Sequence, residues 1–498
     1  MSGLPATRFD FEGPVPSADE LGRVHLIAIG GAGVSGVARL LLARGLAVSG
    51  SDAKDSPLLD ALRAEGATVH VGHDPVYLDG VDTVVVSSAI REDNVELAHA
   101  RALGLPVLHR SQALAAATQG QRVAAVAGAN GKTTTTSMLT VALQGCGVDP
   151  SFAIGGELAK AATNAHGGSG PDFVVEADES DGSFLVYHPT VAVVTNVQPD
   201  HLDHYGTFEQ VKAAYLAFAR SIRPGGLLVA CADDAGSREL AERARADGLR
   251  VLTYGEAEDA DVRVSDIRSA GFAVIATLHE QGEPDRTLTV AIPGTHNALN
   301  ATAAFLAATR GLGYAAADVL AGLADYSGTR RRFELKGVAD GVTVVDDYAH
   351  NAGKVRAVVS TARALVDDPH RLIVIFQPHL YSRTADFARE LGEGLAPADE
   401  VLVMDIYAAR EDPIPGVTGE LVAQAVADAP GFSAHVQYVP TAAEAAEQTV
   451  ALARPGDLVL TVGAGDVTGL GPQLLALLGQ REQGQEQGAE HGQERQRP

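Results

Sequence analysis

Tryptophan is absent from this sequence, and methionine and cysteine are nearly absent. The two cysteines, Cys146 and Cys231, lie far apart and form neither a CxxC motif nor a disulfide-type spacing, which fits a reducing compartment. No apolar run is long enough to span a bilayer, because the run Val24–Ile29 leads directly into glycines. The first twenty residues also lack the charged and apolar halves of a signal peptide. These absences predict a cytoplasmic protein without a membrane segment.

Basic residues are scarce relative to acidic ones: 38 Lys and Arg stand against 63 Asp and Glu, for a net charge of −25. A surface that wraps nucleic acid needs clustered Lys and Arg, so this balance argues against a nucleic-acid partner and does not fit an anionic membrane. Hydrophobic residues make up 46% of the chain and charged residues 20%, as in ordinary globular proteins. At 498 residues the chain is too long for one core, so several domains are expected.

Strand-like runs alternate with helix-like runs along most of the chain, which predicts an α/β fold with mainly parallel sheets. We expect three domains, at residues 1–120, 121–329 and 330–480. Residues 481–498 consist mostly of Gln, Glu, Gly and Arg and hold almost nothing that could be buried. We therefore predict a disordered tail there.

A glycine-rich loop, Gly128-Ala129-Asn130-Gly131-Lys132-Thr133-Thr134, follows the strand-like run Arg122–Ala127 and precedes a helix-like run. This arrangement cradles phosphate, because backbone N–H groups and the helix N-terminus face the anion. Lys132 would add a positive charge and the Thr133 hydroxyl would bind Mg²⁺. An ordinary strand-to-helix turn with a surface lysine is the alternative.

A second glycine-rich turn, GAGVSG at 31–36, follows the first expected strand, and Asp52 closes the next strand. This GxGxxG pattern is typical of a turn that holds a diphosphate. The pattern leaves open whether the diphosphate belongs to NAD, FAD or a UDP-sugar, or whether the turn binds no ligand.

Acidic side chains follow two expected strands of the second domain, as EADESD at 176–181 and DHLDH at 200–204. In open parallel sheets ligands bind at the carboxyl ends of strands, where the phosphate loop also emerges. Carboxylates there suit Mg²⁺, which prefers oxygen ligands and substrate phosphates. Solvated acidic loops and a His/Asp zinc site are the alternatives.

Four further segments carry polar residues at positions where a ligand could bind. Asn297 and Asn300 lie on one face of an expected helix, where their amides suit an adenine edge or a helix cap. One arginine of the triplet Arg330-Arg331-Arg332, beside the second domain boundary, would reach a transferring phosphoryl group if buried between domains, and a solvated triplet is the alternative. DDYAH at 346–350 and QPHLYSRT at 377–384 follow strands of the third domain and are candidates for a ligand cleft.

Taken in chain order, these motifs resemble the Mur ligases of peptidoglycan synthesis. The resemblance covers roughly residues 20–475 and also includes GTHNALN at 294–300, RRFE at 331–334 and GAGD at 463–466. It implies a Rossmann-like UDP-binding domain, a central P-loop ATPase domain and a Rossmann-like C-terminal domain. The alanine-adding branch fits best, because Tyr215 stands near the position where sister ligases use a carbamoylated lysine. That branch implies ATP and Mg²⁺ as cofactors and UDP-N-acetylmuramate and L-alanine as substrates, in a monomer or weak homo-oligomer.

The resemblance also implies roles for single residues. The UDP-substrate would lie on Gly31, Gly33, Gly36 and Asp52. ATP would be held by the loop Gly128–Thr134, with Asn297 and Asn300 facing adenine and Arg332 and Asp347 completing the site. One Mg²⁺ would be held by Thr133 and Glu176, and His201 would help to hold a second metal. Catalysis would rest on Lys132, Glu176, His201 and Arg332, with His379 and Arg383 bordering the acyl phosphate and the amino acid.

Four positions depart from the family pattern: Asn130 replaces a histidine, Gln198 an acid and Leu380 an arginine, while HNAGK at 350–354 replaces HHPTE. A ligase that recycles a tripeptide would share every ATP motif and differ in the third domain. An NAD-dependent oxidoreductase would explain the first glycine turn but neither the second phosphate loop nor the acidic clusters. A non-catalytic nucleotide-binding regulator is a further alternative.

Overall fold

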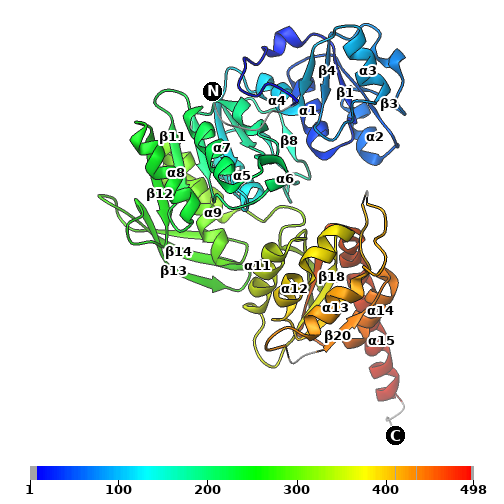
Figure 1. Ribbon diagram of the computed structural model, residues 1–498. Coiled ribbons are helices and arrows are strands. Elements are labelled where there is room, and N and C mark those ends of the chain that lie inside the picture. The colour runs from blue at the N-terminus through cyan, green and yellow to red at the C-terminus, as the bar shows by residue number, and fades with distance from the viewer. Residues whose placement is uncertain (1–7, 410, 433–434, 495–498) are drawn as a thin grey trace. The chain divides into compact units, whose positions relative to one another are not determined.

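A computed structural model describes residues 8–409, 411–432 and 435–494, which form three β-sheets flanked by helices (Figure 1). The chain divides into two compact units between Ser327 and Gly328, two residues before the predicted boundary. The first unit contains two sheets and the second unit contains the third. The predicted α/β fold with mainly parallel sheets is confirmed. The finer boundary at residues 120/121 stays a prediction, and it falls in the connection between α4 and β6.

The first sheet has five parallel strands in the order β3-β2-β1-β4-β5. The order reverses beside β1, whose neighbours on both sides run parallel to it, so the carboxyl end of β1 is where a ligand is expected. The elements are β1 (Val24–Ile27), α1 (Ala32–Ala43), β2 (Val48–Asp52), α2 (Pro57–Ala64), β3 (Thr68–Val71), β4 (Thr83–Val86), α3 (Val95–Ala102), β5 (Val107–His109) and α4 (Arg110–Ala117).

The second sheet has ten strands in the order β15-β14-β13-β12-β11-β10-β6-β9-β7-β8. Its central strands are parallel and almost wholly apolar, because helices cover both faces, whereas β13 to β15 form an antiparallel extension that the sequence did not indicate. The strands are β6 (Arg122–Ala127), β7 (Ser151–Ala153), β8 (Ala165–His166), β9 (Asp172–Glu176), β10 (Val191–Val194), β11 (Leu227–Cys231), β12 (Arg250–Gly255), β13 (Val262–Ala270), β14 (Ala273–Glu280) and β15 (Arg286–Val290). The helices are α5 (Lys132–Gly145), α6 (Leu202–Tyr205), α7 (Phe208–Arg220), α8 (Ala235–Ala246), α9 (Thr295–Leu306) and α10 (Ala316–Ala324).

The second unit is built on a six-stranded sheet in the order β16-β17-β21-β18-β19-β20, parallel except at its β16 edge. The strands are β16 (Glu334–Ala339), β17 (Val342–Asp347), β18 (Leu372–Gln377), β19 (Glu400–Val403), β20 (His435–Tyr438) and β21 (Leu458–Gly463). The helices are α11 (Ala352–Arg363), α12 (Tyr381–Leu395), α13 (Gly419–Ala427), α14 (Ala442–Leu452) and α15 (Leu470–Glu494).

The disordered tail at residues 481–498 stays a prediction; in the structure, residues 481–494 continue helix α15. Its first turns are anchored by Leu470, Leu474 and Leu478, which are buried in the core of the second unit. Gln, Glu and Arg are strong helix formers, so they extend a helix that apolar contacts have already started. The last four residues lie outside the described part of the chain.

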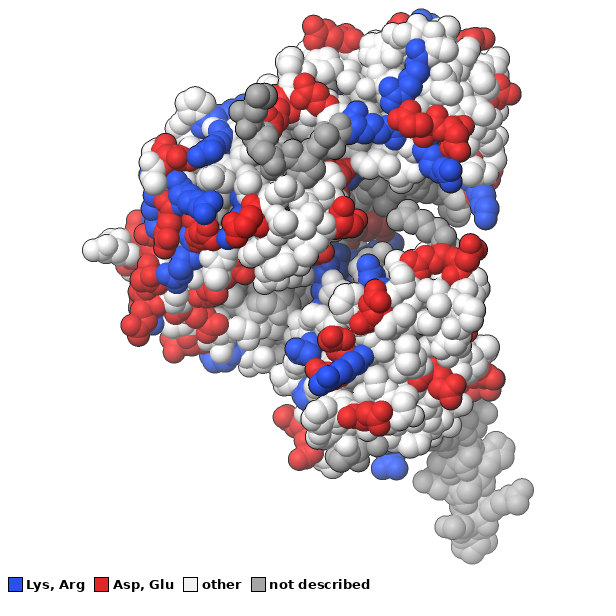
Figure 2. All heavy atoms as spheres, viewed as in Figure 1, with Lys and Arg blue, Asp and Glu red and all other residues white. Residues whose placement is uncertain are grey.

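No helix in the described ranges is long and apolar enough to cross a membrane. On the face shown in Figure 2, the described Lys and Arg side chains are interspersed with Asp and Glu and form no continuous basic surface. This mixed surface agrees with the acidic composition of the chain.

His109, the last residue of β5, is fully buried in the first unit against the rings of Phe9 and Phe11. Burial lowers the pKa of His109 to about 4, although Asp181 lies 3.5 Å from its Nε2 and opposes the shift. The unfolded chain, with an ordinary histidine pKa of about 6.5, therefore binds a proton between these two values that the folded chain does not. The histidine thus costs stability as pH falls from about 6.5 toward 4.

We expect His109→Gln to reduce the loss of thermal stability between pH 7 and pH 5. The substitution removes the group that is protonated only after unfolding, while the amide keeps a polar group beside Ser111 and Ser88. The measurement is the difference in Tm between the two pH values for wild type and variant. An unchanged difference would show that His109 titrates normally.

Candidate active site

The phosphate loop connects β6 to α5. Two of its positions require glycine, because the backbone has a positive φ there and because neighbouring atoms leave no room for a Cβ. Gly128 has φ +138°, and a Cβ there would lie 2.0 Å from Thr195 Oγ1. Gly131 has φ +86°, caps α5, and would bring a Cβ within 2.7 Å of Asn300 Oδ1. Lys132, Thr133 and Thr134 form the first turn of α5, whose backbone N–H groups have no helical partner and can therefore face an anion.

The Lys132 ammonium is held inside the first unit by two oxygen atoms. Its Nζ donates to the backbone oxygen of Gly128 (2.6 Å) and to Oε1 of Glu179 (2.7 Å). Burial opposes the charge on Lys132, but Glu179 and the neighbouring carboxylates outweigh it and raise the pKa of the amine. The lysine is therefore a fixed positive charge at the loop, aligned by Glu179, whose backbone oxygen in turn accepts from Tyr205.

Thr133 and Glu176 are brought together next to the loop, as the predicted metal site requires. Thr133 Oγ1 donates to Glu176 Oε1 (3.0 Å), and the Gly155 backbone N–H donates to Glu176 Oε2 (2.6 Å). His201 is placed differently, because its Nε2 lies 3.8 Å from Glu179 Oε1 and 3.9 Å from Asp200. Within the described residues no three His, Cys, Asp or Glu side chains could hold a metal by themselves. A hydroxyl and one carboxylate fit Mg²⁺ that takes its other ligands from phosphate and water.

Asn297 and Asn300 lie inside α9 and are buried, with 4% and 7% of their surface exposed. The N-cap of α9 is Gly294, so neither asparagine caps the helix. Asn297 donates to the Pro293 backbone oxygen (2.6 Å), and Asn300 donates to Asn297 Oδ1 (3.3 Å). This pair fixes Asn300 against Gly131, at the edge of the phosphate loop.

The glycine turn of the first sheet is arranged around Asp52. Its Oδ2 accepts from the Gly30 backbone N–H (2.9 Å), so the carboxylate shapes the turn directly. Gly36 packs against β8, where an added Cβ would lie 3.2 Å from Ala165. Gly33 faces Arg110, whose Nη1 would be 3.5 Å from such a Cβ. Gly31 is the N-cap of α1 and Gly33 and Gly36 lie in its first turns, so the three predicted glycines and Asp52 gather at the amino end of α1.

In the second unit, Asp347 ends β17 and is buried. It accepts from the backbone N–H groups of Phe333 (2.8 Å) and Ala349 (2.7 Å), and burial raises its pKa despite the nearby Arg332. The Arg332 guanidinium lies over the Tyr348 ring, 5.5 Å from the centroid. Arg332 and Asp347 are therefore neighbours, as predicted for two residues of one site.

His350, His379 and Arg383 gather at the carboxyl ends of β17 and β18. The rings of His350 and His379 lie 5.6 Å apart, and Arg383 Nη1 donates to His379 Nδ1 (3.2 Å), which leaves the His379 proton on Nε2. Burial lowers the pKa of His350 to about 4, so its imidazole is neutral at physiological pH. The neutral His350 imidazole beside the Arg383–His379 pair suits an uncharged amine and an anionic group.

Models of one protein family match most of the chain. The Mur ligase family catalytic-domain model matches residues 23–122, the Mur ligase middle-domain model residues 126–308, and the Mur ligase glutamate ligase domain model residues 331–465. The chain belongs to the Mur ligase family. The chain is thus a ligase, and this family is ATP-dependent.

Individual relatives agree with this assignment. The chain is 56% identical to a UDP-N-acetylmuramate–L-alanine ligase of Kineococcus radiotolerans, over 94% of this chain and 98% of the relative. It is 55% identical to the ligase of the same name from Saccharopolyspora erythraea, over 92% of this chain and 93% of the relative. Among solved structures, the UDP-N-acetylmuramate–alanine ligase of Thermotoga maritima matches with a TM-score of 0.77 and 27% identity, covering 93% of this chain and 99% of the other.

Two of the departures from the Mur ligase pattern contact each other. Asn130 Nδ2 donates to Gln198 Oε1 (3.1 Å), and Gln198 Nε2 donates to Asp234 Oδ2 (3.2 Å). Asn196 and Thr195 also bind the Asn130 backbone, so the loop is fastened to the end of β10. Here a pair of uncharged amides stands where the family pattern has a histidine and an acid.

We expect Asn130→Ala and Gln198→Leu each to raise the KM for ATP by roughly 2- to 10-fold, the scale of one lost hydrogen bond. Because both variants remove the same contact, the double variant should resemble either single variant. Neither amide titrates, so the effect should be equal at pH 6 and pH 9. Steady-state kinetics at both pH values provide the measurement, and additive effects would show that the two side chains act independently.

The other two departures have local structural roles. Asn351 is the N-cap of α11, and its Oδ1 accepts from the Lys354 backbone N–H (2.9 Å). Leu380 is the N-cap of α12 with φ +70°, and its backbone is fixed by Tyr407. Tyr215, the residue that separates the branches, is fully buried in α7 against Phe184, and its hydroxyl has no hydrogen bond within the described residues.

Sequence reasoning did not identify Glu179 as the partner of Lys132, nor Arg110 and Asp178 as a pair. Both carboxylates lie in the EADESD motif that was singled out, so the signal was present. The motif alone could not say which way each carboxylate points. In the structure the two glutamates face the phosphate loop, whereas Asp178 and Asp181 face α4 and the end of β4.

Proposed function

We propose that this Mur ligase joins L-alanine to UDP-N-acetylmuramate with hydrolysis of ATP to ADP and phosphate, as a step of peptidoglycan precursor synthesis. The observation that carries the proposal is that relatives named for this reaction match over more than nine-tenths of both chains. The phosphate loop, with its fixed lysine and its hydroxyl–carboxylate pair, supplies the chemistry that phosphoryl transfer needs.

In the first step a carboxylate oxygen of the muramate attacks the γ-phosphorus of ATP, and the oxygen that bridges the β- and γ-phosphates leaves with ADP. Lys132 and the amino end of α5 neutralise the phosphate oxygens, and Glu179 keeps the lysine aligned until the nucleotide arrives. Thr133 and Glu176 would hold one Mg²⁺, and His201 would help to hold a second metal; such ions would neutralise charge on the phosphate oxygens. Asn297 and Asn300 face the adenine.

In the second step the alanine amine attacks the acyl carbon, the carbon–oxygen bond to phosphate breaks, and the amine loses a proton. His379 and Arg383 border this site and stabilise the acyl phosphate and the alanine carboxylate. Arg332 and Asp347, which are neighbours in the second unit, take part in ATP binding. These groups bind and orient charged reactants, since the reaction needs no protein nucleophile.

The first glycine turn holds the UDP diphosphate, with Gly31, Gly33, Gly36 and Asp52 shaping it. Calorimetric titration of the full-length protein with UDP-N-acetylmuramate and with NAD tests this assignment. We expect saturable binding of the UDP-sugar alone. Binding of NAD without binding of the UDP-sugar would contradict this assignment and favour an oxidoreductase.

A competition assay tests the reaction itself. Phosphate release from ATP with saturating UDP-N-acetylmuramate is compared for L-alanine, L-serine, glycine and L-alanyl-γ-D-glutamyl-diaminopimelate. We expect the highest kcat/KM with L-alanine and lower values with serine and glycine, because one methyl group discriminates by only about 1–3 kcal/mol. A higher kcat/KM with the peptide would identify a recycling ligase instead.

We place the reaction in the cytoplasm, where ATP is available, and we propose a monomer or a weak homo-oligomer. Sedimentation of the purified protein at several concentrations measures the oligomeric state directly.

A further inference from the structure

The loop that follows β9 is attached to helix α4 and the end of β4 by its two aspartates. Arg110 Nη2 donates to Asp178 Oδ2 (2.7 Å). Ser88 Oγ donates to Asp181 Oδ2 (2.5 Å), with His109 Nε2 3.5 Å from the same oxygen. The loop that carries Glu176 and Glu179 is therefore tied to the region that contains the first glycine turn.

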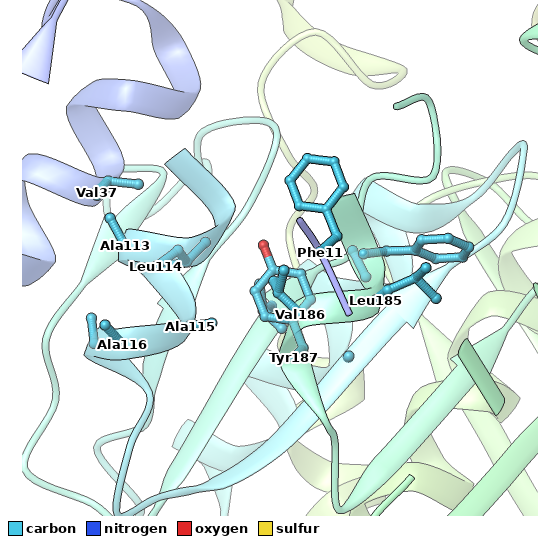
Figure 3. Packing of buried hydrophobic residues seen from close by; sticks show 14 of the residues in the cluster. Phe11, Val37, Ala113, Leu114, Ala115, Ala116, Leu185, Val186 and Tyr187 are labelled. Atoms are coloured by element: carbon cyan, nitrogen blue, oxygen red, sulfur yellow. The ribbon is translucent and has the colours of Figure 1, made fainter. Parts of the chain in front are cut away.

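Apolar packing reinforces these polar contacts. Figure 3 shows Leu185, Val186 and Tyr187 near Leu114 of α4 and near Phe11. All five side chains are buried in one hydrophobic cluster. Since cores are close-packed, a displacement of α4 is transmitted to this loop rather than absorbed.

Arg110 occupies the position between the two sites. Its guanidinium lies in van der Waals range of Gly33, because a Cβ on that glycine would be 3.5 Å from Nη1 and 3.7 Å from Cζ. Within the described residues, the Arg110 guanidinium donates one hydrogen bond, and the Asp178 carboxylate accepts it. A guanidinium has five N–H donors, so several remain for an anion on the side of the glycine turn.

We propose that Arg110 is a substrate-binding residue that donates to the diphosphate held at residues 31–36, and that Asp178 aligns it and links this site to the loop carrying Glu176 and Glu179. The proposal rests on the assignment of the UDP-sugar to that turn. Arginine suits the role because its planar donors match phosphate oxygens, while Asp178 fixes the plane of the guanidinium. Occupation of the first site then orders the carboxylates of the second, since Asp178 lies only two residues from Glu176 and is adjacent to Glu179.

Kinetics of full-length Arg110→Ala, Arg110→Lys and Asp178→Asn test the first half of this proposal. We expect Arg110→Ala to raise the KM for UDP-N-acetylmuramate by about 10- to 100-fold, the scale for a hydrogen bond to a charged group, and to change the KM for ATP far less. Arg110→Lys keeps the charge and should restore only part of the loss. Arg44→Ala is the matched control, because Arg44 caps the far end of α1 and contacts Gln119 and Gln121.

Binding measurements test the linkage. We expect UDP-N-acetylmuramate to tighten the binding of a non-hydrolysable ATP analogue to the wild type by at least about 5-fold, the lower end of typical coupling. In Asp178→Asn, the ratio of the Kd values of the ATP analogue without and with UDP-N-acetylmuramate should fall toward one, while each ligand still binds. A ratio of one in the wild type, or an unchanged ratio in the variant, overturns the linkage.

These experiments distinguish a failure of the proposal for Arg110 from a failure of the proposed function. Wild-type turnover with UDP-N-acetylmuramate and alanine tests that function alone. If turnover is present and the KM for the UDP-sugar is unchanged in Arg110→Ala, the role of Arg110 is overturned. If turnover is absent, calorimetric titration with UDP still tests the role of Arg110. Equal affinities of the wild type and Arg110→Ala for UDP would overturn that role. If Arg110→Ala does not fold, the same comparison is made with Arg110→Lys.

Discussion

Replacing Lys132 by alanine is expected to lower kcat by about 10²- to 10³-fold, the usual cost of removing one preorganised electrostatic contact from a transition state. The ammonium is already fixed at the loop by Gly128 and Glu179, so it needs no reorganisation when phosphate charge develops. The measurement is single-turnover phosphate release with saturating UDP-N-acetylmuramate. A folded variant that keeps most of its activity would remove Lys132 from the mechanism.

The same substitution should also lower the Tm, because it leaves Glu179 buried without its positive partner. Lys132→Ala combined with Glu179→Gln separates the two effects. We expect the double variant to recover much of the Tm, since no buried charge is left unpaired, and to stay as inactive as the single variant. Recovery of activity together with stability would show that the lysine matters for folding alone.

Replacing Glu176 by glutamine should lower kcat by about 10²-fold and raise the Mg²⁺ concentration needed for half-maximal activity. An amide oxygen can still accept from Thr133 or Gly155, so the fold is retained, but the negative charge that attracts the cation is lost. Titration of Mg²⁺ at fixed ATP measures the shift. An unchanged Mg²⁺ requirement would take Glu176 out of the metal site.

Glu209→Gln is the matched control for this experiment. Glu209 is exposed at the start of α7 and pairs with Lys212, so its substitution removes a carboxylate of equal size outside the site. We expect wild-type kcat and Mg²⁺ dependence, because exposed ion pairs contribute little to stability.

The sequence was sufficient for features that depend on local pattern. After Arg122 the run 123–127 is wholly apolar and is followed by Gly128, so it had to be a buried strand leading into a turn, and the Lys–Thr pair that follows had to begin a helix. Strand ends depend on contacts with distant residues: β10 stops at Val194, because Thr195 and Asn196 turn aside to bind Asn130.

Long-range geometry could not be read from the sequence in the same way. Residues 481–494 have a composition typical of disorder, but they follow a helix whose leucines are anchored in a core formed by distant residues. The hydrogen bond between Asn130 and Gln198 joins residues 68 positions apart. No pattern within either segment indicates that contact.

By itself, then, the sequence determined the α/β class, the phosphate loop and the family, because each depends on residue type and spacing within one segment or on the order of segments. Only the tertiary structure decided how the four carboxylates of EADESD divide between two neighbours. Glu176 and Glu179 face the phosphate loop, while Asp178 and Asp181 bind α4 and the end of β4. The physical reason is that these residues follow the end of β9 without a regular repeat, so their directions are set by the partners that the packed sheets and helices bring within hydrogen-bond distance.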